Sequence, residues 1–280
     1  MIILDTKKEY KNHIDLLKSK GEIISLVPTM GNLHEGHLSL IEIAKKNSSK
    51  VVTTIFVNPL QFGKNEDFTA YPRTISEDII KLKKQNCNIL FIPKNANEIF
   101  DNINNLENLK AGPKGNILCG KIRPGHFDGV LKVVYMLFQL TKPHLSVFGI
   151  KDFQQLYLVK QMAKKYFPKI KIISAPTIRN RNGLALSSRN SYLDKKSIEI
   201  APLFYKILLD GINNLKNSNN VEETIKNITK TLEKNEFLVN YVSFVSPKLE
   251  KIKTNNSEKK ILLSSVKLDQ TILIDNIEFR

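Results

Sequence analysis

The sequence predicts an α/β protein in which a Rossmann-like, doubly wound parallel sheet is followed by a smaller α+β domain. Short, continuous apolar segments alternate with helical patterns through the first two-thirds of the chain, which is typical of strands buried on both faces of a parallel sheet. After residue 176 two long helical patterns precede three strand patterns, an order that favours a separate α+β unit. We therefore expect domains at residues 1–176 and 177–280.

Each expected element follows from its apolar period and its flanking residues. In the first domain we expect strands at 23–27, 51–57, 89–93, 145–148 and 170–174, and helices at 38–47, 75–85, 130–140 and 153–166. The Asn-rich stretch 95–116 lacks a clear period and predicts loops with about one helical turn. In the second domain we expect helices at 198–216 and 221–235, and strands at 239–245, 260–266 and 271–277.

The composition predicts a globular chain without targeting or membrane segments. Hydrophobic residues make up 41% and charged residues 25% of the sequence, which is the ordinary globular range. The apolar start is too short for a secretory signal, and the apolar run at 133–138 is far too short to span a membrane. Cys87 and Cys119 form no metal-spacing motif and indicate a reducing compartment. We therefore expect a cytoplasmic protein with no membrane partner.

The net charge of +16 raises the question of a nucleic-acid partner. The lysines are scattered, however, and occur as pairs such as Lys45/Lys46 and Lys83/Lys84 on polar helix faces. No aromatic RNA-binding motif or arginine-rich tract accompanies them. This pattern favours solvated helix faces and predicts no nucleic-acid partner; a polyanion-binding surface and attraction of small anionic substrates are the alternatives.

Residues 23–37, which contain VPTMGNLHEGH, predict a buried strand, a Gly-containing loop and the start of a helix. This order places His34, His37 and free backbone N–H groups at a helix N-terminus, where the dipole favours a nucleotide phosphate. Zinc proteases place two histidines four residues apart, whereas these are three apart, with no cysteine or third histidine nearby. The spacing therefore favours phosphate contact over metal binding.

Polar residues also follow the other predicted strands, at the sheet edge where open parallel sheets bind ligands. Candidate groups after the later strands are Asn58 and Gln61, then Gly149, Lys151, Asp152 and Gln155, then Arg179, Ser187, Ser188 and Arg189. Lys151 and Arg189 suit phosphate oxygens, and the serines add neutral donors. Asp152 suits Mg²⁺, directly or through water, although capping a helix is its alternative role. Arg123, in RPGHF, is a further anion contact or part of a turn.

Six motifs in this order resemble those of the pantoate–β-alanine ligase (pantothenate synthetase) family. They are VPTMGNLHEGH, FVNPLQF, YPRT, RPGHF, FGIKDFQQL and GLALSSRN, with LIDN near the end of the chain. HEGH alone would indicate only the wider HxGH nucleotidyltransferase-like superfamily. The resemblance implies a ligase that condenses (R)-pantoate with β-alanine through a pantoyl adenylate, releasing AMP and diphosphate. It also implies a homodimer that needs Mg²⁺ together with ATP. Because an adenylate can be hydrolysed, the site must exclude water between the steps, and we expect the C-terminal domain to act as a lid.

The resemblance further implies a role for each matching residue. The implied catalytic residues are His37, His34, Lys151 and Arg189. The implied ATP-binding residues are Met30, Gly31, Asn32, Leu33, His34, Glu35, Gly36, His37, Gly149, Ile150, Lys151, Asp152, Ile178, Leu186, Ser187, Ser188 and Arg189. Gln61 and Gln155 would contact pantoate, with Gln61 also near β-alanine, and Asn58, Tyr71 and Arg123 would line the pocket. Asp152 is the implied contact to Mg²⁺.

Two positions depart from the family pattern. Ile150 stands where the family usually has Glu, and Asn182 where it usually has Asp. Both remove a negative charge near the expected nucleotide, which affects binding strength more than the catalytic set. The alternatives are another adenylyl-transferring enzyme of the superfamily, which would not need FVNPLQF and FQQL, and a nucleic-acid-binding relative of aminoacyl-tRNA synthetases.

Overall fold

A computed structural model describes residues 1–64, 66–100, 106, 108–254 and 259–280 of the chain. The chain forms two compact units, one of residues 1–150 and 154–176, the other of residues 151–153 and 177–280. The short segment Lys151–Phe153 therefore groups with the second unit, although it lies within the expected first domain. No helix in the described part of the chain is long and apolar enough to cross a membrane.

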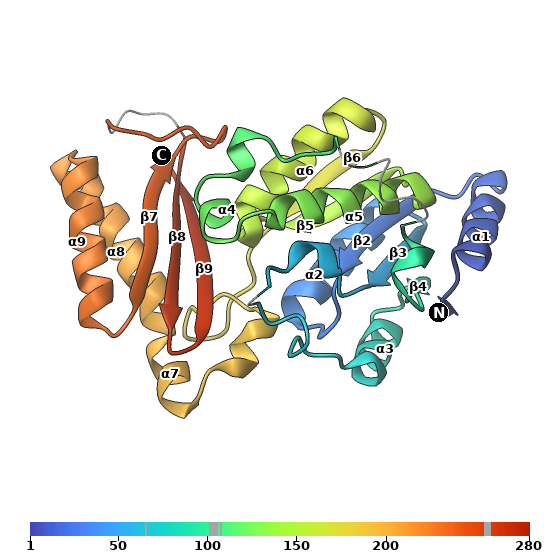
Figure 1. Cartoon of the computed structure of the whole chain (residues 1–280), viewed down its shortest axis with the longest axis horizontal. Helices are drawn as coiled ribbons and strands as arrows, with labels where there is room; N and C mark the ends of the chain where they lie inside the picture. Colours follow the sequence, from blue (N-terminus) through green and yellow to red (C-terminus); the bar gives the residue numbers. More distant parts are fainter. Residues whose placement is uncertain (65, 101–105, 107, 255–258) are drawn as a thin grey trace. The chain divides into compact units, whose positions relative to one another are not determined.

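The first unit is built on a parallel sheet of six strands in the order β1-β4-β3-β2-β5-β6 (Figure 1). The strands are β1 (Ile2–Leu4), β2 (Ile24–Thr29), β3 (Lys50–Ile55), β4 (Ile89–Phe91), β5 (Leu145–Gly149) and β6 (Lys171–Ala175). The chain runs outward from β2 through β3 to β4 on one side, and through β5 to β6 on the other. This reversal is the switch point at which doubly wound sheets bind ligands. The predicted fold class is confirmed.

Helices cover both faces of this sheet. Helices α1 (Lys7–Ser19), α5 (His126–Thr141) and α6 (Phe153–Tyr166) share one apolar cluster with the sheet, and α2 (Glu35–Asn47) and α3 (Ile75–Lys84) share the other. Successive residues of β2 serve the two clusters in turn, since Leu26 lies in the first and Val27 in the second. Strands that are apolar on both faces require this two-sided cover, which explains why they read as continuous apolar runs.

The second unit packs helices against an antiparallel sheet with the order β7-β8-β9. Its elements are α7 (Lys195–Ile200), α8 (Pro202–Ser218), α9 (Val221–Lys234), β7 (Leu238–Val245), β8 (Lys260–Leu268) and β9 (Thr271–Phe279). Phe204 and Leu208 of α8 and Leu232 of α9 form its core with Phe244 and Leu262 of the sheet. The central strand β8 is buried along almost its whole length because both of its edges are paired.

Short elements connect the larger ones and carry several candidate residues. They are η1 (Pro59–Gln61), η2 (Ala96–Glu98), η4 (Pro113–Gly115), α4 (Cys119–Ile122), η5 (Ile150–Asp152) and η6 (Ser188–Tyr192). Within the stretch expected to be loops, residues 101–105 and 107 lie outside the described residues.

Several elements differ from the sequence prediction. Helix α5 begins four residues earlier than expected and ends one residue later. The stretch 95–116, expected to hold about one helical turn, contains two short turns, η2 and η4, among its described residues. The expected helix 198–216 is two helices, because Pro202 has no N–H and starts α8 at its first turn. Helix α2 begins three residues earlier than expected, with His34 as its N-cap. The sequence prediction also lacked β1 and α1. Strand β1 has only three residues, and the many lysines of α1 obscure its buried stripe of Tyr10, Ile14 and Leu17.

Candidate active site

The switch point of the sheet lies between the neighbouring strands β2 and β5. Strand β2 ends at Thr29 and is followed by the loop that carries Met30 and leads to His34. Strand β5 ends at Gly149. The loop after β2 is thus placed at the position where a doubly wound sheet binds its ligand.

His34 and His37 are held by the backbone at the start of α2. The His34 Nδ1 accepts from the Gly36 N–H (3.1 Å), and the His37 Nδ1 accepts from the His34 N–H (3.3 Å). This reciprocal pair is a capping box made by two imidazoles, whose ring centroids are 4.1 Å apart. Because both Nδ1 atoms accept, each neutral ring carries its proton on Nε2. The structure thus sets both histidines as Nε2–H donors at a positive helix end.

Most backbone N–H groups of this loop and of the start of α2 have partners within the fold. The Gly31 N–H donates to Thr29 Oγ1, and the Asn32 and Leu33 N–H groups donate to the Asp78 carboxylate. The N–H groups of His34 and Gly36 are taken by the two imidazoles. Since buried backbone donors must be paired, the fold satisfies them internally. The imidazole N–H groups are donors of the kind that can follow charge on a phosphate.

Asp78 of α3 is a fully buried carboxylate that fixes the loop. Its two oxygens accept from the Asn32 N–H (2.9 Å) and the Leu33 N–H (2.7 Å). Lys81, one turn further along α3, donates to the Leu33 carbonyl (2.6 Å). Gly31 adopts a positive φ of 83°, and a Cβ there would lie 3.1 Å from the Asp78 carboxylate. Helix α3 therefore holds the loop in place through charged side chains.

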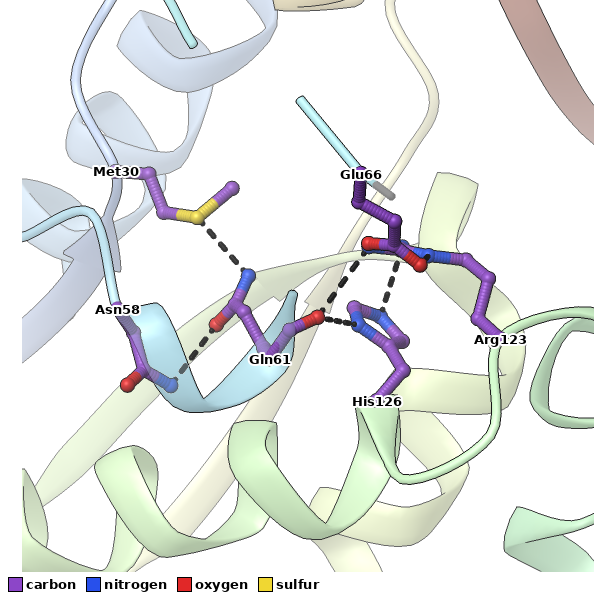
Figure 2. Close-up of polar contacts among 6 residues, drawn as sticks. All are labelled: Met30, Asn58, Gln61, Glu66, Arg123 and His126. Atoms are coloured by element: carbon purple, nitrogen blue, oxygen red, sulfur yellow. Dashed lines mark hydrogen bonds and ion pairs between the residues drawn. The ribbon is translucent and has the colours of Figure 1, made fainter. Parts of the chain in front are cut away.

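The Gln61 carboxamide lies against the loop after β2 (Figure 2). Its Nε2 donates to the Met30 sulfur (2.9 Å), and its Oε1 accepts from the Asn58 Nδ2 (3.2 Å). Asn58 is buried, caps η1 through the Leu60 N–H, and also donates to the Gly129 carbonyl of α5 (3.0 Å). Of the expected site residues, Met30, Asn58 and Gln61 are thus brought together.

A second group of side chains holds the main chain of Gln61 (Figure 2). The Gln61 carbonyl accepts from His126 Nδ1 (2.7 Å) and from Arg123 Nη2 (3.4 Å). Arg123 also contacts His126 Nε2 (3.2 Å) and makes a two-bond ion pair with Glu66. Burial acts to raise the pKa of the Glu66 carboxyl, but the hydrogen bond and charge of Arg123 outweigh it and lower that pKa below its usual value.

Two further candidates differ in burial, since Gln155 is half-buried and Tyr71 is buried. Gln155 lies half-buried on α6, and its amide makes no hydrogen bond to any residue that the structure describes. Its neighbour Gln154 is buried and binds the backbone at Lys114, Ile117 and Cys119. Tyr71 is buried and packs edge-on against Phe62. Of the two glutamines, Gln155 is the one whose amide remains available for a ligand, since Gln154 supports the fold.

The Lys151 and Asp152 side chains lie in the second unit and face each other, with Nζ 3.6 Å from Oδ1. The Asn276 amide of β9 donates to the Lys151 carbonyl (2.8 Å). Among the described residues no group of three or more His, Cys, Asp or Glu side chains is arranged to hold a metal ion. Asp152 is 45% exposed, so its carboxylate fits Mg²⁺ that is held mainly by nucleotide phosphates and water.

The segment with the remaining candidates folds back on itself in the second unit. The Leu186 N–H donates to the Ile178 carbonyl (2.9 Å), and Ser187 caps η6 through the Arg189 N–H. Near the start of this segment the Arg179 guanidinium lies over the Tyr205 ring. Its Nη1 and Nη2 donate to the two carboxylate oxygens of buried Asp275, at 2.5 and 2.8 Å. Arg179 thus anchors the segment that presents Ser187, Ser188 and Arg189.

The two departures from the family pattern have different surroundings. Ile150 is half-buried and packs against the apolar core of the first unit. Asn182 is exposed in the turn before Gly183, and its N–H donates to the Asn180 side chain (3.0 Å). The Ile150 side chain therefore contributes to apolar packing, whereas Asn182 lies in a polar turn.

Asp78, Glu66 and His126 shape the site, yet none was assigned a role from the sequence. One signal was available for Asp78, because it lies four residues before Leu82 on the buried stripe of α3, where a carboxylate needs a partner. His126 lay inside the RPGHF motif. Glu66 had no signal, since its partner Arg123 is 57 residues away in the chain.

The doubly wound parallel sheet, with a histidine-capped helix at its switch point, defines a Rossmann-like α/β protein suited to a phosphate-bearing ligand. The chain belongs to the pantoate-beta-alanine ligase family, whose model matches residues 2–278. The resemblance noted in the sequence is confirmed.

Relatives and solved structures agree over nearly the full length of the chain. It is 43% identical to the pantothenate synthetase of Buchnera aphidicola subsp. Acyrthosiphon pisum over 279 residues, covering 99% of this chain and 98% of that one. It is 41% identical to the pantothenate synthetase of Methylobacillus flagellatus, covering 91% and 92% of the two chains.

Two solved structures share the fold. The Thermus thermophilus pantothenate synthetase superposes with a TM-score of 0.88 at 34% identity, covering 99% of both chains. The Francisella tularensis pantoate-beta-alanine ligase, described as complexed with beta-gamma ATP and beta-alanine, has a TM-score of 0.82 at 37% identity, covering 99% of this chain and 97% of that one.

Proposed function

We propose that the chain catalyses the ATP-dependent condensation of (R)-pantoate with β-alanine to pantothenate, AMP and diphosphate. The observation that carries this proposal is the family match over residues 2–278. The Francisella relative described with an ATP analogue and β-alanine supports these two substrates. The enzyme is accordingly a ligase that forms an amide bond.

In the first step a pantoate carboxylate oxygen attacks the α-phosphorus of ATP, and the bond to diphosphate breaks. The carboxylate is already ionised near neutral pH, so this step needs no general base. It needs stabilisation of charge as it moves onto the departing diphosphate. The Nε2–H groups of His34 and His37 are set by the capping box to supply this, and Lys151 and Arg189 would add positive charge.

In the second step the neutral β-alanine amine attacks the acyl carbon and the new C–N bond forms. The C–O bond to AMP breaks, AMP leaves with the electron pair of that bond, and the proton lost by the amine passes to solvent. The adenylate is open to hydrolysis, so water must be kept from the site between the steps. We assign pantoate contact to the amides of Gln61 and Gln155, and β-alanine contact to Gln61. Neutral amides suit hydroxyl and carboxylate groups without trapping either substrate as an ion pair.

Mg²⁺ would accompany the nucleotide and neutralise phosphate charge. Asp152 would contact it, directly or through water, while the backbone near Gly149, Ile178 and Leu186 would hold the nucleotide. We further propose that the enzyme is a cytoplasmic homodimer and that residues 177–280 act as a lid. Identical domain positions with and without ATP would exclude the lid.

The adenylate mechanism is tested by ATP–diphosphate exchange without β-alanine. We expect exchange that depends on pantoate and that falls about a hundred- to thousand-fold in His37→Ala, because one transition-state contact is lost. His13→Ala, on α1, is the matched control and should leave exchange unchanged. Exchange without pantoate would favour another adenylyl-transferring enzyme, and active product formation without any exchange would exclude the intermediate.

A further inference from the structure

We infer that His126 is a positioning residue that sets the Gln61 carboxamide for pantoate by holding the Gln61 main-chain carbonyl. The inference rests on the proposed function, because it takes Gln61 as a pantoate contact. His126 itself lies on the opposite side of Gln61 from the Met30 and Asn58 contacts to the carboxamide (Figure 2). It therefore acts through Gln61.

The Gln61 carbonyl needs an external donor because of its place in η1. Gln61 is the last residue of this three-residue turn, whose own backbone bonds end with the Phe62 N–H on the Pro59 carbonyl. Carbonyl groups at a helix end have no partner within the helix. His126 Nδ1, at 2.7 Å, supplies the shorter of the two bonds that satisfy this one.

The contacts of the carboxamide are too weak to set its position alone. A thioether sulfur is a weak acceptor, and the Asn58 bond to Oε1, at 3.2 Å, is at the upper end of the usual range. Both would give way when pantoate takes the amide. The hydrogen bond from His126 to the Gln61 carbonyl does not have to break when pantoate binds the carboxamide. This bond therefore determines the position of the main chain from which the Gln61 side chain extends.

One tautomer of His126 satisfies both of its ring contacts. The Gln61 carbonyl can only accept, so Nδ1 must carry the proton, and the Arg123 guanidinium can only donate, so Nε2 must accept. The partner of one ring nitrogen thus fixes the state of the other. Glu66 in turn fixes Arg123 through its ion pair. We therefore assign Arg123 to this support chain: its guanidinium is bound to Glu66, His126 and the Gln61 carbonyl.

Three substitutions at His126 separate the two ring contacts. In His126→Asn the amide nitrogen takes the place of Nδ1 and keeps the donor to Gln61. In His126→Gln the longer amide takes the place of Nε2 and keeps only the contact to Arg123. His126→Phe keeps the ring volume and neither contact, His13→Phe on α1 is the matched control, and Gln61→Ala reports the full effect.

The experiment measures KM for pantoate and for ATP, with kcat, on the purified full chain, and thermal unfolding of each variant. We expect His126→Phe and His126→Gln to raise the KM for pantoate about tenfold, as loss of one hydrogen bond does, with the KM for ATP within about twofold of the wild type. His126→Asn should stay within about threefold of the wild type for both substrates. If His126→Phe does not fold, the Asn and Gln variants give the comparison.

Several outcomes overturn the inference. Equal impairment of the Asn and Gln variants, equal rises in KM for ATP and pantoate, or no effect in any variant would each do so while leaving the proposed function intact. If the wild type makes pantothenate but Gln61→Ala keeps its KM for pantoate, the Gln61 assignment fails and the inference falls with it. A wild type that makes no pantothenate would refute the proposed function itself.

Discussion

At the scale of single residues, one buried carboxylate determines the shape of the loop that leads into the two histidines. Asp78 takes two backbone N–H groups of that loop, and Lys81 takes its carbonyl at Leu33. A buried donor left without its partner costs about 1–3 kcal/mol. The loop and the histidine-capped end of α2 therefore depend on a residue of α3 that does not touch the proposed nucleotide.

We predict that Asp78→Asn weakens ATP binding while it spares pantoate binding. The amide has one acceptor oxygen in place of two, so one loop N–H loses its partner, and the variant should unfold about 1–3 kcal/mol more easily. The KM for ATP should rise severalfold, and the KM for pantoate should stay unchanged. Glu77→Gln is the matched control, since Glu77 is exposed on the same helix. Steady-state kinetics and urea unfolding check both effects, and an unchanged KM for ATP would contradict the role of Asp78.

The Glu66–Arg123 ion pair makes the stability of the fold depend on pH. Its pKa is lowered in the folded chain, so the ion pair with Arg123 stabilises the fold fully above the unfolded pKa of about 4.3. That stability is lost as the pH falls through the lower, folded value. We predict that Glu66→Gln is less stable than the wild type at pH 7 and that the difference shrinks toward about pH 3.

Urea unfolding at both pH values measures this difference. The matched control is Glu199→Gln, which removes an exposed charge on α7 and should change stability little at either pH. A stability difference for Glu66→Gln that is the same at both pH values would show that the ion pair carries no acid dependence.

At the scale of elements, the contact between η1 and α5 sets the position of Gln61. Gly129 of α5 lies so close to η1 that a Cβ there would be 2.0 Å from the Leu60 carbonyl oxygen. The same contact carries the bond from Asn58 to the Gly129 carbonyl. The glycine therefore costs α5 some helix propensity, about 1 kcal/mol relative to Ala, in return for close packing against η1.

We predict that Gly129→Ala destabilises the chain and displaces η1, although Ala is the better helix former. Overpacking of this kind costs about 1–3 kcal/mol, which exceeds the gain in propensity. The KM for pantoate should rise with the displacement of Gln61. Gly63→Ala is the control, because a Cβ there would meet Glu66 at an ordinary 3.6 Å. Thermal unfolding measures the loss of stability, and steady-state kinetics measures the KM for pantoate. A Gly129→Ala variant that is more stable than the wild type would refute the packing argument.

At the scale of the whole molecule, the charge of +16 is the property that most invites another function. Several of the lysines form ion pairs with neighbouring carboxylates, as Lys50 does with Glu22 and Lys110 with Asp128. Ion pairs that solvent reaches, as these do, contribute little to stability. They show that part of the positive charge faces acidic side chains of the chain itself.

We predict that RNA binds this protein only through scattered phosphate contacts. Affinity for a single-stranded RNA should therefore fall steeply with salt and be weaker than about 1 μM at physiological salt. A single-stranded DNA of the same length and sequence is the control and should bind equally, since no 2′-hydroxyl is recognised. Fluorescence anisotropy across a salt series measures both, and nanomolar RNA binding that survives salt would reopen the nucleic-acid alternative.

Periodicity was sufficient for most of the fold, and its failures have local causes. Continuous apolar runs located β2, β3, β4, β5 and β6 to within about three residues, because strands buried on both faces must be apolar throughout. The missed strand β1 lies at an edge and exposes Ile2 and Ile3. The split between α7 and α8 was readable at Pro202, but the apolar period runs across it.

By itself the sequence determined the class of fold, the family and the residue types of the candidate site, since these depend on local period and on motifs such as HEGH and FQQL. The tertiary structure decided which groups hold those residues in place. Asp78 reaches the loop from 45 residues away, and His126 reaches Gln61 from 65 residues away. Such bonds join segments that are distant in the chain, so no local pattern marks them. Burial decides their importance, because an unpaired polar group inside the fold has no water to replace its partner.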